Sequence, residues 1–131
     1  MSLSIQPLFK SMVRQFHTVT TDERFQADFV DATNDVLDEL SFLDETTSHI
    51  EHINTTHDSI SEMNYSHAYI VKAGLVLNLI LSGRKHLSGD NAFAIAQARW
   101  NETKGDYQVK NYIDDADEDE ADLVGLGYVG D

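Results

Sequence analysis

The amino-acid sequence predicts a mainly α-helical fold, a small bundle of about four helices followed by an extended acidic C-terminal arm. Apolar side chains recur at intervals of three and four over residues 22–43, the pattern of a helix with one buried face. The most apolar window, residues 68–81, is shorter than the roughly 20 residues of a membrane span and is typical of a buried core helix. Residues 114–122 are almost all acidic, and this run sets the arm apart from the helical part.

Length and composition favour one folded helical domain over residues 1–107, with the arm over 108–131. The chain has 131 residues, of which 41% are hydrophobic, close to the proportion in ordinary globular proteins. It contains no cysteine, so packing or assembly must supply its stability. The net charge of −14 argues against direct binding of DNA phosphates, which needs a basic surface.

Two helices are expected near the start of the chain. Apolar side chains that follow Pro7 predict a short amphipathic helix within residues 3–17. Thr20 and Glu23 have the spacing of a capping box, which predicts a second helix over about 22–43. The apolar stripe of this second helix comprises Phe25, Phe29, Ala32, Val36, Leu40 and Leu43, and its opposite face carries Asp28, Asp31, Asp35, Asp38 and Glu39.

Residues 44–60 form a polar connection rich in Thr and Ser, with isolated isoleucines. Partial alternation in the segment SHIEHI allows a short strand or a hairpin here, and the alternative is a long loop. A connection of this length in a compact domain is usually functional or part of an interface.

A third helix is expected over about 61–82, with Ser59 and Glu62 as a second capping box and Gly83 as its C-terminal cap. Because its centre is apolar nearly all round, it must be covered on every side. The fourth helix is expected to start from Ser88 or Asp90 and to end near Gly105. Residues 107–113 alternate, which predicts an edge strand or an extended arm there.

Neither a metal site nor a catalytic site is predicted. His49, His52 and His57 lie close together in the chain, with Glu51 and Asp58 nearby, but they lack the regular spacing of a metal-binding helix. The favoured interpretation is a polar surface loop. The acids of the second helix are likewise interpreted as a solvated helix face and not as a general acid–base pair. We therefore expect no enzyme activity, no cofactor and no metal.

Two features suggest contact with partners. Trp100 is a candidate interface anchor, although a Trp on an alanine-rich helix more often packs in its own core. The arm ends in an apolar tip, which suits docking in a groove or strand addition to a partner's sheet edge. The residues of this tip are Leu123, Val124, Leu126, Tyr128 and Val129.

Three segments together carry a resemblance to a known family: FVDATNDVLDELSFL at 29–43, HAYIVKAGLVLNLILSGRK at 67–85 and AIAQARWNETKGDY at 94–107. This pattern of helices and residue types resembles the head-to-tail connector or adaptor proteins of tailed bacteriophages, also called neck or head-completion proteins. The resemblance covers roughly residues 5–107.

The resemblance implies a virion protein that assembles in the host cytoplasm and lies in the neck, between capsid and tail. It implies a homo-oligomeric ring, commonly dodecameric, beneath the portal protein, with a tail or stopper protein on the other side. DNA would pass through the ring without specific binding, and no membrane would be involved. The alternative hypothesis from the charge is an acidic DNA mimic or an inhibitor-type binding module.

Overall fold

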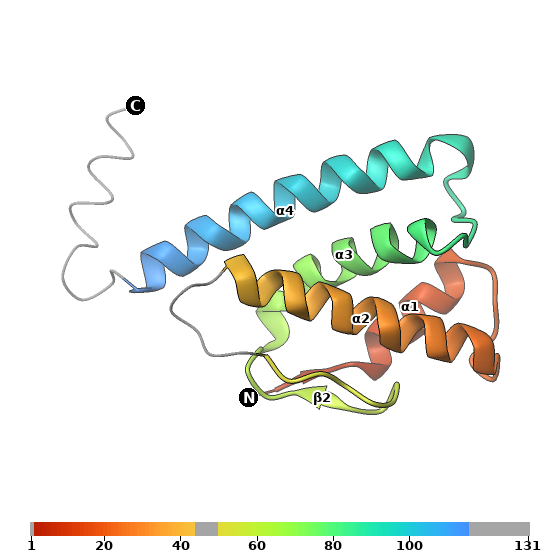
Figure 1. Cartoon of the computed structure of the whole chain (residues 1–131), viewed down its shortest axis with the longest axis horizontal. Helices are drawn as coiled ribbons and strands as arrows, with labels where there is room; N and C mark the ends of the chain where they lie inside the picture. The colour runs from red at the N-terminus through yellow and green to blue at the C-terminus, as the bar shows by residue number, and fades with distance from the viewer. Residues whose placement is uncertain (1, 44–49, 116–131) are drawn as a thin grey trace.

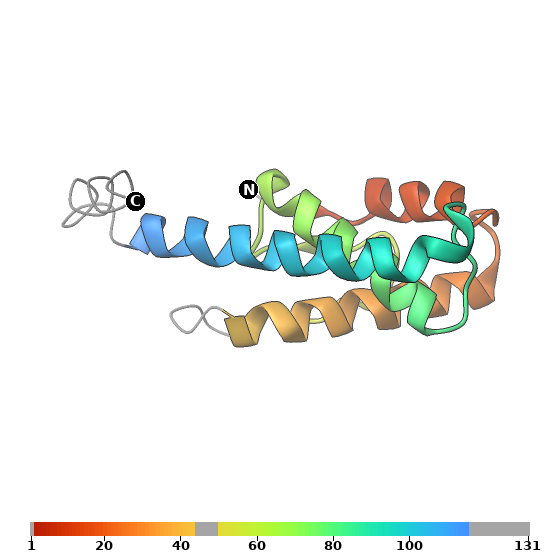
Figure 2. The same cartoon turned by 90° about the horizontal axis from the view of Figure 1, so that it is seen from above.

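The computed structural model describes residues 2–43 and 50–115, and it confirms a mainly helical bundle (Figure 1). The α-helices of these residues are α1 (Gln6–Gln15), α2 (Glu23–Leu43), α3 (Ala68–Leu81) and α4 (Ala92–Asp115). Successive helices run in opposite directions, and the α1–α2 and α3–α4 connections lie at the same end of the bundle. Seen from above, α4 runs across the front of the molecule, with α1 to one side of it and α2 to the other (Figure 2).

The apolar spacing of α1 and α2 brings their aromatic rings together in one core. Phe9 on α1 lies 5.1 Å from Phe29 and 6.0 Å from Phe25, measured between ring centroids. All three side chains are 1% exposed or less, so this cluster fixes α1 against α2. The first-turn position of Pro7, where no helical N–H is lost, explains why α1 begins where the sequence predicts.

Asp22 caps α2, so the predicted Thr20–Glu23 capping box is wrong. The Asp22 carboxylate accepts hydrogen bonds from the backbone N–H groups of Arg24 and Phe25, both at 3.1 Å. The Thr18 hydroxyl donates to the other oxygen of the same carboxylate at 2.7 Å. An Asp at this position satisfies the free N–H groups of the first turn, and a reciprocal glutamate is not needed. The helix itself spans the predicted residues.

The connection between α2 and α3 is not a hairpin in its described part, residues 50–58. Its two-residue strand β2 (Ser59–Ile60) instead pairs antiparallel with β1 (Leu3–Ser4), with Leu3 opposite Ile60. Ile53 exchanges two hydrogen bonds with the Asn34 side chain, at 2.8 Å and 3.0 Å. The isoleucines of this connection are therefore buried, and Ile53 attaches the connection to α2.

The start of α3 lies several residues beyond the predicted one. Ser59 belongs to β2, and Asn64 and His67 form the capping box of a 3-10 turn, η1 (Tyr65–His67), that leads into α3. The end of α3 agrees with the prediction. Gly83 has a φ of 102°, and the N–H groups of Gly83 and Arg84 donate to the carbonyls of Ile80 and Leu79 at 3.0 Å and 3.1 Å. This is a Schellman cap, which requires a residue that tolerates positive φ.

The strand predicted for residues 107–113 is wrong, because α4 continues through them to Asp115. Tyr107 is buried and lies seven residues, about two helical turns, beyond Trp100. It therefore lies on the same apolar face of α4 as Trp100, Ala96 and Ala92. Burial of this face of α4 in the core outweighs the alternation of polar and apolar residues that predicted a strand. Gly105 is tolerated inside the helix, and the expected end there is also wrong. The helix crosses the predicted boundary at 107, while residues 116–131 of the arm lie outside the described part.

The fourth helix also begins differently from the prediction. A short 3-10 turn, η2 (Gly89–Asn91), precedes it. The Ser88 side chain makes no capping hydrogen bond, and Asp90 lies within the turn. The chain therefore enters α4 directly from the 3-10 turn η2.

Most of the apolar surface of α3 is covered by the chain's own helices. Buried residues occur at Ile70, Val71, Leu75, Leu77 and Leu79, and α3 contacts α1, α2 and α4. The core helix thus needs no partner subunit to cover most of its sides. None of the described helices is long and apolar enough to cross a membrane.

Candidate functional site

Trp100 belongs to the core and has no free surface with which to anchor a partner. Its side chain is 2% exposed and packs on α3 at Gly74. A Cβ atom at position 74 would lie 2.9 Å from the Trp100 ring and 2.6 Å from Val36. Glycine therefore allows α2, α3 and α4 to meet closely at this point, and Trp100 packs in its own core, the interpretation that the sequence favoured over an interface anchor.

The arm tip of Leu123, Val124, Leu126, Tyr128 and Val129 lies outside the described residues. Its role in docking stays a prediction from the sequence.

The histidines of the α2–α3 connection do not form a metal site in the described residues. No group of three His, Cys, Asp or Glu side chains with metal-binding geometry occurs there. His52 Nε2 lies 2.7 Å from Asp38 Oδ1, and His49 is outside the described residues. The Asp58 carboxylate accepts from the backbone N–H groups of Asn54 and Thr55, which lowers its pKa and closes the turn.

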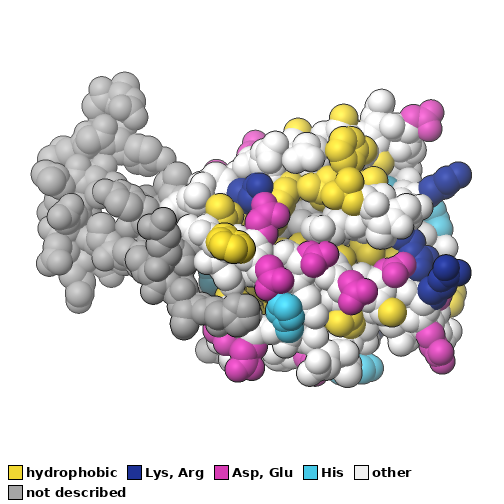
Figure 3. Space-filling model, viewed as in Figure 1, with side chains coloured by type: hydrophobic (Ala, Val, Ile, Leu, Met, Phe, Trp, Pro, Cys, Tyr) yellow, Lys and Arg dark blue, Asp and Glu magenta, His cyan; other side chains and the backbone are white. Residues whose placement is uncertain are grey.

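The acidic face of α2 is partly neutralised by its neighbours. Asp28 pairs with Arg84 at 2.7 Å, Glu39 pairs with Lys104 at 2.7 Å, and Asp38 contacts His52. Figure 3 shows a row of acidic side chains over α2, below a group of hydrophobic side chains over α4. The remaining two acids of the row, Asp31 and Asp35, are exposed.

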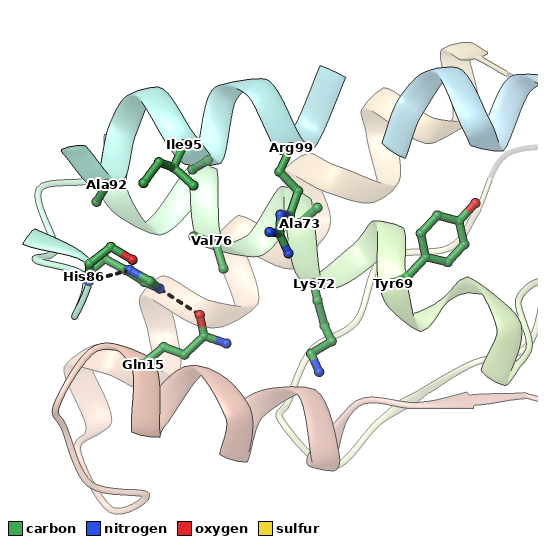
Figure 4. A pocket seen from close by; sticks show the side chains of 11 residues that line it. Gln15, Tyr69, Lys72, Ala73, Val76, His86, Ala92, Ile95 and Arg99 are labelled. Atoms are coloured by element: carbon green, nitrogen blue, oxygen red, sulfur yellow. Dashed lines mark hydrogen bonds between the residues drawn. The ribbon is translucent and has the colours of Figure 1, made fainter. Parts of the chain in front are cut away.

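A cavity of about 430 Å³ lies between α1, α3 and α4 (Figure 4). Val76 and Ala73 on α3 and Ile95 on α4 supply much of its apolar surface. This volume is within the range of about 300–1,000 Å³ typical of ligand sites. The complete lining is Gln15, Tyr69, Lys72, Ala73, Val76, His86, Ser88, Ala92, Ile95, Ala96 and Arg99.

Two cations face this cavity without a counter-ion in the described residues. Lys72 projects from α3 toward α1, and Arg99 reaches from α4 toward α3. Neither is among the ion pairs formed within residues 2–43 and 50–108. Because Lys72 and Arg99 both line the same cavity, their positive charges make this part of the surface suited to an anion.

The opposite end of the cavity is closed by His86 and Gln15. His86 Nε2 lies 2.7 Å from Gln15 Oε1, and the imidazole packs edge-on against Phe16 with centroids 5.1 Å apart. Burial of the ring, with a smaller contribution from His17, lowers the pKa of His86 below its ordinary value of 6.5. This end of the cavity is therefore neutral, and the positive charge is concentrated at Lys72 and Arg99.

Tyr69 lies at the other end, beyond Lys72 (Figure 4). Its side chain is partly buried, and this burial raises the pKa of the phenol, with further contributions from the nearby charges of Asp106 and Tyr107. Tyr69 therefore stays a neutral hydroxyl, able to donate a hydrogen bond at the rim of the cavity.

Large apolar side chains are exposed around the α3–α4 connection. Leu81, Leu87, Phe93 and Ile95 are 62%, 56%, 48% and 51% exposed. Ile95 continues this apolar surface into the cavity, since it is also a lining residue. Apolar surface concentrated in this way on a folded domain commonly marks a contact with another molecule.

The described residues thus combine a cavity with an exposed apolar corner of α3 and α4 on a helical bundle. No family model, curated protein or solved structure matches this chain. No pattern in the sequence predicts this cavity. Its only signal in the sequence was the presence of Lys72 and Arg99 as isolated cations within otherwise apolar helix segments.

Proposed function

We propose that the chain is a structural assembly protein, a head-to-tail adaptor of a tailed bacteriophage that forms a homo-oligomeric ring beneath the portal. The resemblance over residues 5–107 supplies the family, and the helical bundle agrees with what that family implies. In this proposal the protein is part of the virion neck and contacts the portal protein on one side and a tail or stopper protein on the other.

The exposed apolar corner around the α3–α4 connection is the observation that carries the proposal. Leu81, Leu87 and Phe93 are about half exposed or more, although the core of the chain is complete without them. Contacts that join one face of a subunit to a different face of the next close into a ring when the rotation allows it. The apolar corner would be one of the two faces that such a contact joins.

The charge of the body suits a conduit for DNA. Asp31 and Asp35 are exposed on α2, and a surface that is negative repels phosphates and lets DNA pass without being held. A DNA mimic would need its carboxylates free to meet a basic partner. On α2, three of the five acids are engaged with Arg84, Lys104 and His52, so the adaptor is the better supported function.

The mass of the full chain in solution, measured alone and then with portal rings, tests the proposal. We expect a concentration-dependent assembly, or a complex with the portal. A protein that stays monomeric at every concentration and ignores the portal would contradict it.

A pair of variants on α4 tests the surface itself. Phe93→Ser removes an exposed aromatic ring and should weaken assembly, whereas Ala98→Ser changes another exposed position of the same helix and should not. Equal assembly of both variants would mean that the α3–α4 corner is not the contact. Circular dichroism of each variant verifies that the bundle stays folded.

A further inference from the structure

The cavity between α1, α3 and α4 combines apolar and cationic side chains. Its floor is apolar, formed by Val76 and Ala73 with Ile95 opposite, and two cations without a counter-ion in the described residues stand over it. A matching ligand would carry carboxylates directly beside apolar groups. A single carboxylate would pair with the cations but leave the apolar floor uncovered. A purely apolar segment would cover the floor but leave the cations without a partner.

The chain contains a segment with this chemistry. Glu120 and Asp122 end the acidic run, and Leu123, Val124 and Leu126 follow them directly. We propose that the cavity is the receptor for residues 120–129 of a second copy of the chain. The carboxylates of Glu120 and Asp122 pair with Lys72 and Arg99, and the leucine side chains occupy the apolar floor. This inference rests on the self-association in the proposed function and names the surface that receives the arm.

The length of the arm favours a neighbouring copy over the same chain. The 16 helical residues from Arg99 to Asp115 are about 24 Å long, and the seven residues 116–122 span at most about 25 Å when fully extended. To pair Asp122 with its own Arg99, the arm would have to run back along α4 at nearly full stretch, past Glu102 and Asp106, whose charges repel it. An arm from a second copy need not be fully stretched and need not run past these two acids.

Docking of this kind has a defined outcome for assembly. The cavity lies near the start of α4 and the arm follows the other end of the same helix, so donor and receptor are different faces of one subunit (Figure 1). Each copy then gives its arm to one neighbour and receives the arm of another. This is a head-to-tail contact, the arrangement that closes into rings.

Disulfide trapping between full-length chains tests the proposal, since the natural chain has no cysteine to interfere. The variant Ile95→Cys places a thiol in the cavity, and Leu126→Cys places one in the arm of a second chain. When the two proteins are mixed under oxidising conditions, a cross-linked pair of the two variants should form. Asp35→Cys, on the exposed face of α2, is the matched control and should trap the arm far less.

Charge reversal tests the role of the two cations. Adding Lys72→Glu and Arg99→Glu to the Ile95→Cys chain should slow trapping by about tenfold, the effect of losing two partly exposed ion pairs. Arg24→Glu with Lys85→Glu changes the net charge equally at exposed sites outside the cavity and should leave trapping unchanged. Glu120→Lys with Asp122→Lys in the arm should restore trapping to the reversed cavity.

The outcomes separate this inference from the proposed function. Chains that assemble by mass but trap the arm no faster at residue 95 than at residue 35 would overturn the docking site while leaving self-association intact. Trapping that ignores charge reversal would also overturn it. In a chain carrying both cysteines, closure of the disulfide within single molecules at high dilution would show that the arm returns to its own cavity, against the proposal. Chains that remain monomeric at every concentration would contradict both proposals.

Discussion

The two sides of α3 are packed in opposite ways. On one side, Gly74 brings the helix so close to Val36 and Trp100 that a single added carbon atom would overlap them. On the other side, the next residue toward the N-terminus, Ala73, lines a cavity of about 430 Å³. Small residues thus serve close packing on one face of this helix and leave space on the other. The first side holds the bundle together, and the second side faces the cavity.

Loss of the Trp100 ring should have the largest effect on the packed side. Trp100→Ala removes a side chain that is 2% exposed and leaves a void between α3 and α4, so we expect the free energy of unfolding to fall by about 3–5 kcal/mol. Urea denaturation followed by circular dichroism measures this change.

The matched control is Phe93→Ala on the same helix, where the ring is 48% exposed. Its loss should cost less than about 1 kcal/mol in the isolated chain. Similar costs for the two variants would contradict the contrast between packed and open surfaces.

Gly74→Ala should have the next largest effect. The added methyl group would lie 2.6 Å from Val36 Cγ2, and the overpacking should lower the free energy of unfolding by about 1–3 kcal/mol. At Gly105 on α4, no atom lies within 4 Å of an added Cβ, and Gly105→Ala should instead stabilise the helix by up to about 1 kcal/mol. Opposite signs for the two substitutions, measured by urea denaturation, are the expected result.

His86 gives the open side a smaller dependence on pH. Burial lowers the pKa of His86 in the folded chain below its ordinary value of 6.5, so the unfolded chain binds the proton more readily. The contribution of His86 to stability is present above pH 6.5 and is lost as the pH falls through the lowered pKa. His86→Gln should flatten this part of the pH profile of the urea midpoint, and an unchanged slope would argue against a buried neutral imidazole.

Asp22 should produce the smallest effect, at more acidic pH. The Thr18 hydroxyl, followed by the backbone N–H of Phe25, lowers the pKa of this carboxyl below 3.8. Its contribution is therefore present above pH 3.8 and is lost as the pH falls through the lowered pKa. Asp22→Asn keeps a capping oxygen but does not titrate, so its acid denaturation should lack this component. A profile identical to that of the natural chain would show that the cap does not titrate with folding.

The parts of the fold that follow from local chemistry could be predicted from the sequence. Pro7 located the start of α1, the apolar stripe gave the length of α2, and Gly83 gave the end of α3. Each of these signals acts within a few residues of its effect. The predicted caps at Thr20 and Ser59 were wrong because several residues of capping type lie close together, and tertiary contacts choose among them.

Features that depend on distant pairing could not be predicted. The alternation in residues 107–113 suggested a strand, but the register of Tyr107 with Trp100 against α3 made the segment helical. The cavity needs the faces of three helices to be placed together, and no local pattern connects Lys72 with Arg99. Periodicity shows which residues a helix buries, but not which neighbouring helix covers them.

The placement of Trp100 has a practical consequence for spectroscopy. It is the only tryptophan in the chain, and it lies in the α3–α4 contact with the Lys104 ammonium 5.3 Å from the centre of its ring. Its fluorescence should therefore report on one event, the seating of α4 on the bundle. A red shift of the emission without loss of helical signal would reveal a state in which α4 has separated while the other helices remain formed.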